Sequence, residues 1–73
     1  MSTIKVLGID LGKSNFHLIG RDSHEQCVYR KKLSRQKLLE FIANLPSCII
    51  AFEACGGAHW LGRYCQRHNH TVR

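Results

Sequence analysis

The chain has 73 residues, of which 44% are hydrophobic and 22% charged, with one proline and six glycines. This length limits it to one domain with a thin core, and the composition excludes collagen-like, low-complexity and wholly disordered chains. A net charge of +6 suits a polyanionic partner such as nucleic acid. We expect a cytoplasmic protein with reduced cysteines, because no signal peptide and no apolar run of membrane-spanning length is visible.

The first half of the sequence predicts three strands. Ile4 to Leu11 is apolar on both faces except at Lys5, a pattern typical of a central strand covered on both sides. Asn15 to Gly20 alternates and predicts a second strand, antiparallel to the first if the turn between them is a hairpin. Gln26 to Lys32 predicts a third strand, whose basic end is typical of a sheet edge.

The second half predicts two helices and two more strands. Apolar residues at helical spacing indicate a helix between Ser34, a good N-cap, and Pro46, which ends it. Cys48 to Phe52 is a fourth apolar strand, and Leu61 to His68 carries the apolar face of a second helix. Thr71 to Arg73 indicates the start of a fifth strand.

The order of these elements predicts the fold class. Antiparallel hairpins come first, and a strand, crossover helix and return strand then make a parallel pair, right-handed in nearly all cases. We therefore expect an α/β fold with a mixed sheet, the opening half of a ribonuclease-H-like domain. Residues 1–73 would form one partial domain of a longer protein.

Two acidic residues stand at matching strand ends. Asp10 ends the first strand and Glu53 the fourth, and parallel neighbours bring their carboxyl ends to the same edge of a sheet. Converging carboxylates repel unless a cation lies between them, and oxygen ligands suit Mg²⁺ or Mn²⁺. The sequence therefore predicts a divalent-metal site at Asp10 and Glu53; the alternative is a pair of ordinary turn acids.

Three motifs stand out along the chain. The first runs from Gly8 to Lys13, with sequence GIDLGK, and the second comprises Arg30–Leu33 and Lys37–Phe41. The most specific is EACGGAHW, from Glu53 to Trp60, followed by Arg63. Together these motifs resemble the DEDD-type transposases of bacterial insertion sequences, and the resemblance covers essentially the whole chain.

The resemblance implies a RuvC-like, Mg²⁺-dependent DNA recombinase that is guided by a structured RNA and moves its own element. The first Asp and the Glu of the family's acidic tetrad would be Asp10 and Glu53. The two later Asp and the family's serine domain have no counterpart in this sequence, so we expect the isolated chain to be catalytically incomplete. The full-length parent would be a homo-oligomer acting on DNA in the bacterial cytoplasm, near the nucleoid.

Basic residues supply the candidate nucleic-acid contacts. Lysines and arginines at an edge strand and helix start can hold a phosphate backbone, or can simply be a charged edge that prevents strand addition. A base could stack on Trp60, although an aromatic residue at that position also suits the core. The predicted contacts are Lys13, Arg30, Lys31, Lys32, Arg35 and Lys37.

Two other functions stay open. GIDLGKSN, from Gly8 to Asn15, also resembles the first phosphate loop of actin-like ATP-binding folds. A zinc or nucleic-acid adaptor is the third possibility, although the spacing of its candidate ligands matches no common zinc finger. Those ligands are Cys55, His59, Cys65, His68 and His70.

Overall fold

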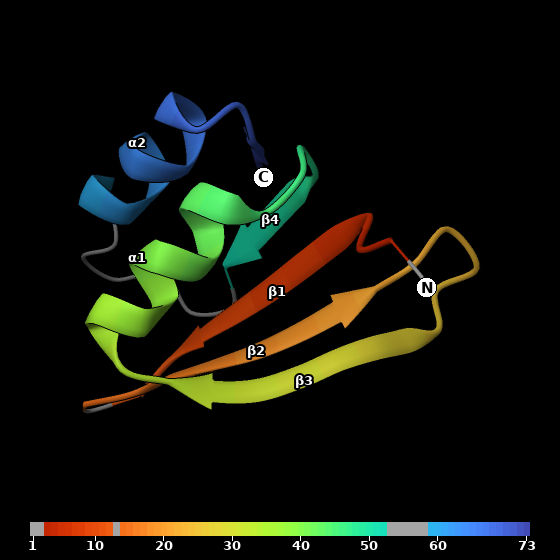
Figure 1. The fold of residues 1–73 in the computed structure, drawn as a ribbon, viewed down its shortest axis with the longest axis horizontal. Helices are drawn as coiled ribbons and strands as arrows, with labels where there is room; N and C mark the ends of the chain where they lie inside the picture. The colour runs from red at the N-terminus through yellow and green to blue at the C-terminus, as the bar shows by residue number, and fades with distance from the viewer. Residues whose placement is uncertain (1–2, 13, 53–58) are drawn as a thin grey trace.

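A computed structural model describes residues 3–12, 14–52 and 59–73. The predicted element order is confirmed. The bounds are β1 Val6–Leu11, β2 Phe16–Arg21, β3 Cys27–Leu33, α1 Arg35–Asn44, β4 Ile49–Phe52, α2 His59–Arg67 and β5 Thr71–Val72 (Figure 1).

The five strands form one mixed sheet in the order β3-β2-β1-β4-β5. β2 pairs antiparallel with both β1 and β3, while β4 pairs parallel with both β1 and β5. The predicted α/β mixed sheet is therefore confirmed. Its ribonuclease-H-like character stays a prediction.

A tight hairpin sets the register between β1 and β2. The backbone N–H of Gly12 donates to the carbonyl of Asn15 at 2.9 Å. A Cβ atom on Gly12 would lie 2.7 Å from that same carbonyl oxygen, so the turn has no room for a larger residue. This closure pairs Leu11 with Phe16 and Asp10 with His17.

Helix α1 begins and ends where the sequence predicts. The Ser34 hydroxyl accepts a hydrogen bond from the Lys37 N–H at 3.3 Å, as an N-cap should. At the other end Leu45 is extended, with ψ of 133°, because the ring of Pro46 excludes helical geometry from the residue before it.

The core lies on one face of the sheet, beneath both helices (Figure 1). Strand residues of this core alternate with residues that face the other way, because successive side chains of a strand point to opposite faces. Within the described residues, β1 is therefore covered on one face of the sheet only, whereas the sequence predicted that both faces are covered. The fully buried residues are Leu7, Ile9, Leu18, Leu38, Ile42, Ile50, Leu61 and Cys65.

One buried histidine joins α1, β4 and the start of β5. His70 is only 4% exposed, and its Nε2 lies 2.9 Å from the carbonyl oxygen of Ile42. Its Nδ1 accepts the backbone N–H of Cys48 at 3.3 Å. Because Nδ1 accepts and Nε2 faces a carbonyl, the ring is neutral with its proton on Nε2. His70 therefore connects the end of α1 to the start of β4.

The cysteines of the described residues are free thiols. Cys27 is exposed, Cys48 half-buried and Cys65 buried. None of the helices in the described residues is long and apolar enough to cross a membrane.

Candidate functional site

Asp10 lies near the carboxyl end of β1, the central strand of the sheet. Its side chain is exposed, whereas the preceding Ile9 is buried in the core. By strand alternation, the Asp10 carboxylate belongs to the face that α1 and α2 do not cover. It is therefore accessible to a ligand on that side.

The strands that carry the two predicted metal ligands lie side by side and run in the same direction. Ile9 of β1 pairs with Phe52 of β4, so Asp10 and Glu53 each follow a directly paired residue. This confirms the predicted placement of the two strands. Glu53 itself lies outside the described residues, and the convergence of the two carboxylates stays a prediction.

A hollow of about 530 Å³ opens on the face that carries Asp10. Asp10 pairs with His17 on β2, and His17 pairs with Lys32 on β3. A carboxylate, an imidazole and an ammonium group thus stand in one row across three strands. Of this row, Asp10 and His17 line the hollow, together with Val6, Gly8, Ile19, Arg21 and Ala51.

Of the predicted Mg²⁺ or Mn²⁺ ligands, the described residues include Asp10. Within residues 3–12, 14–52 and 59–73, no three His, Cys, Asp or Glu side chains form a group that could hold a metal ion. The other predicted ligand, Glu53, lies outside these residues. An exposed carboxylate at a strand end is a fitting donor for a hard cation.

The zinc candidates do not form a ligand set in the part of the chain that the structure describes. Both ring nitrogens of His70 are engaged by backbone groups. Burial, and secondly the nearby Cys48, raise the pKa of the Cys65 thiol to about 11, so it is protonated at neutral pH. Zinc binds the thiolate form. Cys55 and the side chain of His59 lie outside the described residues.

The basic run does not form one surface. Arg30 and Lys32 pair with Ile19 and His17, which line the open hollow. Lys31 lies between them on the strand and faces the helix side, where it lines a groove with Lys37. Alternation along β3 therefore divides the predicted nucleic-acid contacts between two faces.

Arg35 has a different partner. Its guanidinium carbon lies 4.2 Å from the ring centroid of Trp60, which is a cation–π contact. Trp60 is half-buried against the core, in keeping with the structural alternative for this residue. The remaining candidate for a phosphate contact, Lys13, lies outside the described residues.

Sequence reasoning did not select His17 as a site residue. The alternation of Phe16 to Ile19 does place His17 on the face opposite Leu18. A hairpin closed at Gly12 and Asn15 then pairs it with Asp10. The turn type was the missing information, since a shift of one residue would send His17 to the other face.

Comparison with known proteins shows similarity to transposases over the whole chain. The chain is 40% identical over 73 residues to the transposase for insertion sequence element IS1328 of Yersinia enterocolitica, covering 100% of this chain and 22% of that protein. It is 43% identical over 67 residues to a probable family 20 transposase of Pseudomonas aeruginosa, covering 92% and 20%. It is 38% identical over 61 residues to the IS1111A transposase of Coxiella burnetii, covering 82% and 17%.

The chain spans about a fifth of the length of the curated relatives it matches. No family model and no solved structure matches it. The similarity confirms the resemblance to insertion-sequence transposases and favours neither an actin-like ATP-binding fold nor a zinc adaptor. The DEDD, RuvC-like subtype stays a prediction.

Proposed function

We propose that this chain is part of a DNA transposase and supplies two acidic ligands of a divalent-metal site for DNA strand cleavage and transfer. The observation that supports the proposal is the parallel pairing of β1 with β4, in which Ile9 and Phe52, the residues directly before Asp10 and Glu53 in sequence, are partners. Similarity to insertion-sequence transposases over the whole chain supports DNA as the partner.

In this proposal Asp10 and Glu53 would hold Mg²⁺ or Mn²⁺. Such an ion, when bound, activates water or a 3′-hydroxyl and stabilises the leaving oxygen of a phosphodiester. His17 and Lys32 stand beside Asp10 in the same row, where their donors can orient a phosphate oxygen. Two carboxylates do not complete a nuclease site of this type, so the isolated chain is expected to bind metal without cutting DNA.

The remaining parts of the proposal concern the parent protein. We propose a RuvC-like, ribonuclease-H-like nuclease domain, a guide RNA, a homo-oligomeric parent and a site of action in the bacterial cytoplasm at the nucleoid. These rest on the sequence motifs at Gly8–Lys13 and Glu53–Trp60.

Metal binding by the chain tests the proposal directly. Isothermal titration calorimetry with Mn²⁺ should show one site in the wild type. Asp10→Asn and Glu53→Gln should each weaken it by at least about 10-fold, a loss that outer-shell substitutions at metal sites already cause.

Asp22→Asn is the matched control, because Asp22 is an acid of the β2–β3 turn whose carboxylate accepts only turn N–H groups, at 2.9 and 3.0 Å. Equal Mn²⁺ affinity in all four proteins would overturn the assignment of Asp10 and Glu53 as ligands.

A further inference from the structure

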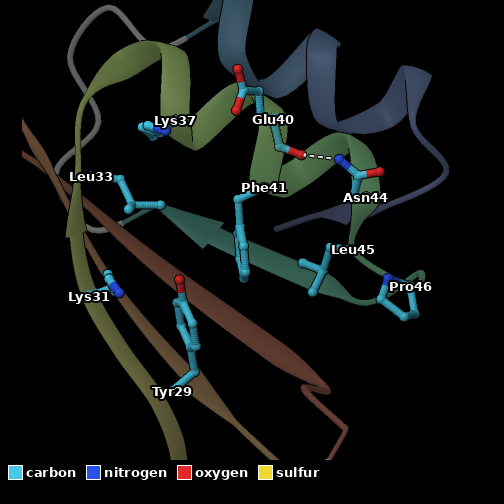
Figure 2. Close-up of a pocket in the computed structure, with 9 residues that line it drawn as sticks. All are labelled: Tyr29, Lys31, Leu33, Lys37, Glu40, Phe41, Asn44, Leu45 and Pro46. Carbon is cyan, nitrogen blue, oxygen red and sulfur yellow. Dashed lines mark hydrogen bonds between the residues drawn. The ribbon is translucent and has the colours of Figure 1, made fainter.

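A second concave surface lies on the other side of the sheet, between the edge strand β3 and helix α1 (Figure 2). It is a groove of about 560 Å³. We call it the β3–α1 groove. Its lining residues are Tyr29, Lys31, Leu33, Lys37, Glu40, Phe41, Asn44, Leu45 and Pro46.

A stacked aromatic pair forms the centre of the β3–α1 groove. The rings of Tyr29, from β3, and Phe41, from α1, have centroids 4.7 Å apart and planes inclined by 13°. Both side chains line the groove and are only partly buried, so part of their aromatic surface borders it. A Cβ atom on Gly20 would lie 2.8 Å from Cδ1 of Ile4 and 3.1 Å from Cβ of Tyr29, so the glycine leaves room for both side chains.

Two lysines flank the aromatic pair. Lys31 comes from β3 and Lys37 from the first turn of α1, and both are exposed (Figure 2). The single acid of the groove, Glu40, directs its carboxylate away from Phe41 in this view. Asn44 donates its amide to the Glu40 carbonyl at 2.8 Å, which leaves its side-chain oxygen available. The groove therefore combines flat apolar surface with positive charge.

We propose that the β3–α1 groove binds single-stranded DNA, with an unpaired base on the Tyr29–Phe41 pair and phosphates at Lys31 and Lys37. Aromatic side chains stack on bases only where the bases are not stacked in a duplex, and lysines hold the adjoining backbone. The open hollow at Asp10 lacks this chemistry, because its described lining residues are aliphatic or polar with no aromatic ring but that of His17.

This inference rests on the proposed function for its choice of DNA, but it concerns residues on the opposite face from Asp10. A strand held in the groove would be a strand already separated from its complement. The groove would thus keep an unpaired strand on the protein.

Fluorescence anisotropy with a labelled oligothymidylate tests the inference. Lys31→Gln and Lys37→Gln should each weaken binding. Each should also make the negative slope of log affinity against log salt shallower by about 0.7, the value for one phosphate contact on a single strand. Lys5→Gln is the matched control: it removes the same charge from an exposed lysine just before β1 that does not line the groove.

The aromatic contribution is tested by two substitutions at Tyr29. Tyr29→Phe keeps the ring and should bind as the wild type does. Tyr29→Leu should weaken binding by about 5- to 100-fold, the range reported for loss of one stacked base. If Tyr29→Leu does not fold, ultraviolet cross-linking of the wild type should still place the oligonucleotide on the peptide that carries Tyr29 or Phe41.

Several outcomes would overturn the inference. These are an equal loss in Lys5→Gln and Lys31→Gln, duplex DNA binding as tightly as the single strand, or an RNA of the same length binding more than 10-fold tighter. Failure to bind any nucleic acid would also overturn it. Asp10→Asn should bind oligothymidylate as the wild type does. The metal proposal is tested by Mn²⁺ affinity in the Asp10 and Glu53 variants, and this inference by oligothymidylate affinity in the groove variants, so the failure of one can be told from the failure of the other.

Discussion

The hydrogen bonds of His70 lead to a quantitative prediction about stability. Replacing His70 by Leu introduces an apolar side chain of similar size and removes both ring nitrogens. The Cys48 N–H then loses its partner at 3.3 Å, and the Ile42 carbonyl loses its donor at 2.9 Å. Ile42 keeps a second donor, the Leu45 N–H at 3.3 Å, so the larger loss falls on Cys48.

An unsatisfied buried N–H costs about 1–3 kcal/mol and a lost second bond to a carbonyl about 0.5–1.5 kcal/mol. The His70→Leu substitution should therefore lower the free energy of unfolding by about 2–4 kcal/mol. A chain of this size has a total stability on the order of 4–11 kcal/mol, so the loss is a large fraction of it. The melting temperature should fall by more than about 10 °C.

Urea unfolding followed by circular dichroism and by Trp60 fluorescence measures this loss. His24→Leu is the control, because His24 is exposed in the β2–β3 turn and should change stability by less than about 0.5 kcal/mol. A His70→Leu protein within that same limit would refute the reasoning. Nitrogen NMR of the wild type should also show the His70 proton on Nε2.

Two further predictions concern a glycine and a thiol. Gly12→Ala should lower the free energy of unfolding in urea by about 1–3 kcal/mol, because its Cβ would lie 2.7 Å from the Asn15 carbonyl oxygen. Gly62→Ala is the control and should not lower it, because the nearest atom to its Cβ would be 3.9 Å away. Equal losses in the two variants would contradict the prediction. Cys65 should resist alkylation in the native state while exposed Cys27 reacts. Burial raises the pKa of Cys65 from 9.0 to about 11, so folding favours the protonated thiol. The contribution of this thiol to stability is complete below pH 9 and is lost as the pH rises toward 11. Melting curves of Cys65→Ala should lack this pH-dependent loss.

Much of the fold follows from local patterns. The apolar run of β1, the Ser34 cap and the Pro46 stop each act through neighbours in sequence, so the order of strands and helices was predictable. The prediction that Leu61 and Cys65 face the core is also confirmed. Each of these inferences needed only spacing and side-chain type.

The parts of the site that could not be predicted depend on register. A run of basic residues reads as one patch in sequence, but the two-residue period of β3 sends Lys31 and Lys32 to opposite faces. The Tyr29–Phe41 stack joins a strand to a helix whose relative position only the packed core determines. The pairing of Asp10 with His17 likewise required the hairpin geometry.

The place of β1 in the sheet affects how the protein folds during synthesis. β1 leaves the ribosome before the other four strands of this sheet, yet one of its two neighbours, β4, begins only at Ile49. The nascent chain can form the hairpin early, but the parallel edge of its central strand stays unpaired until translation has passed residue 52. A translational pause before that point would prolong the time during which the unpaired backbone N–H and C=O groups of β1 can pair with other nascent chains.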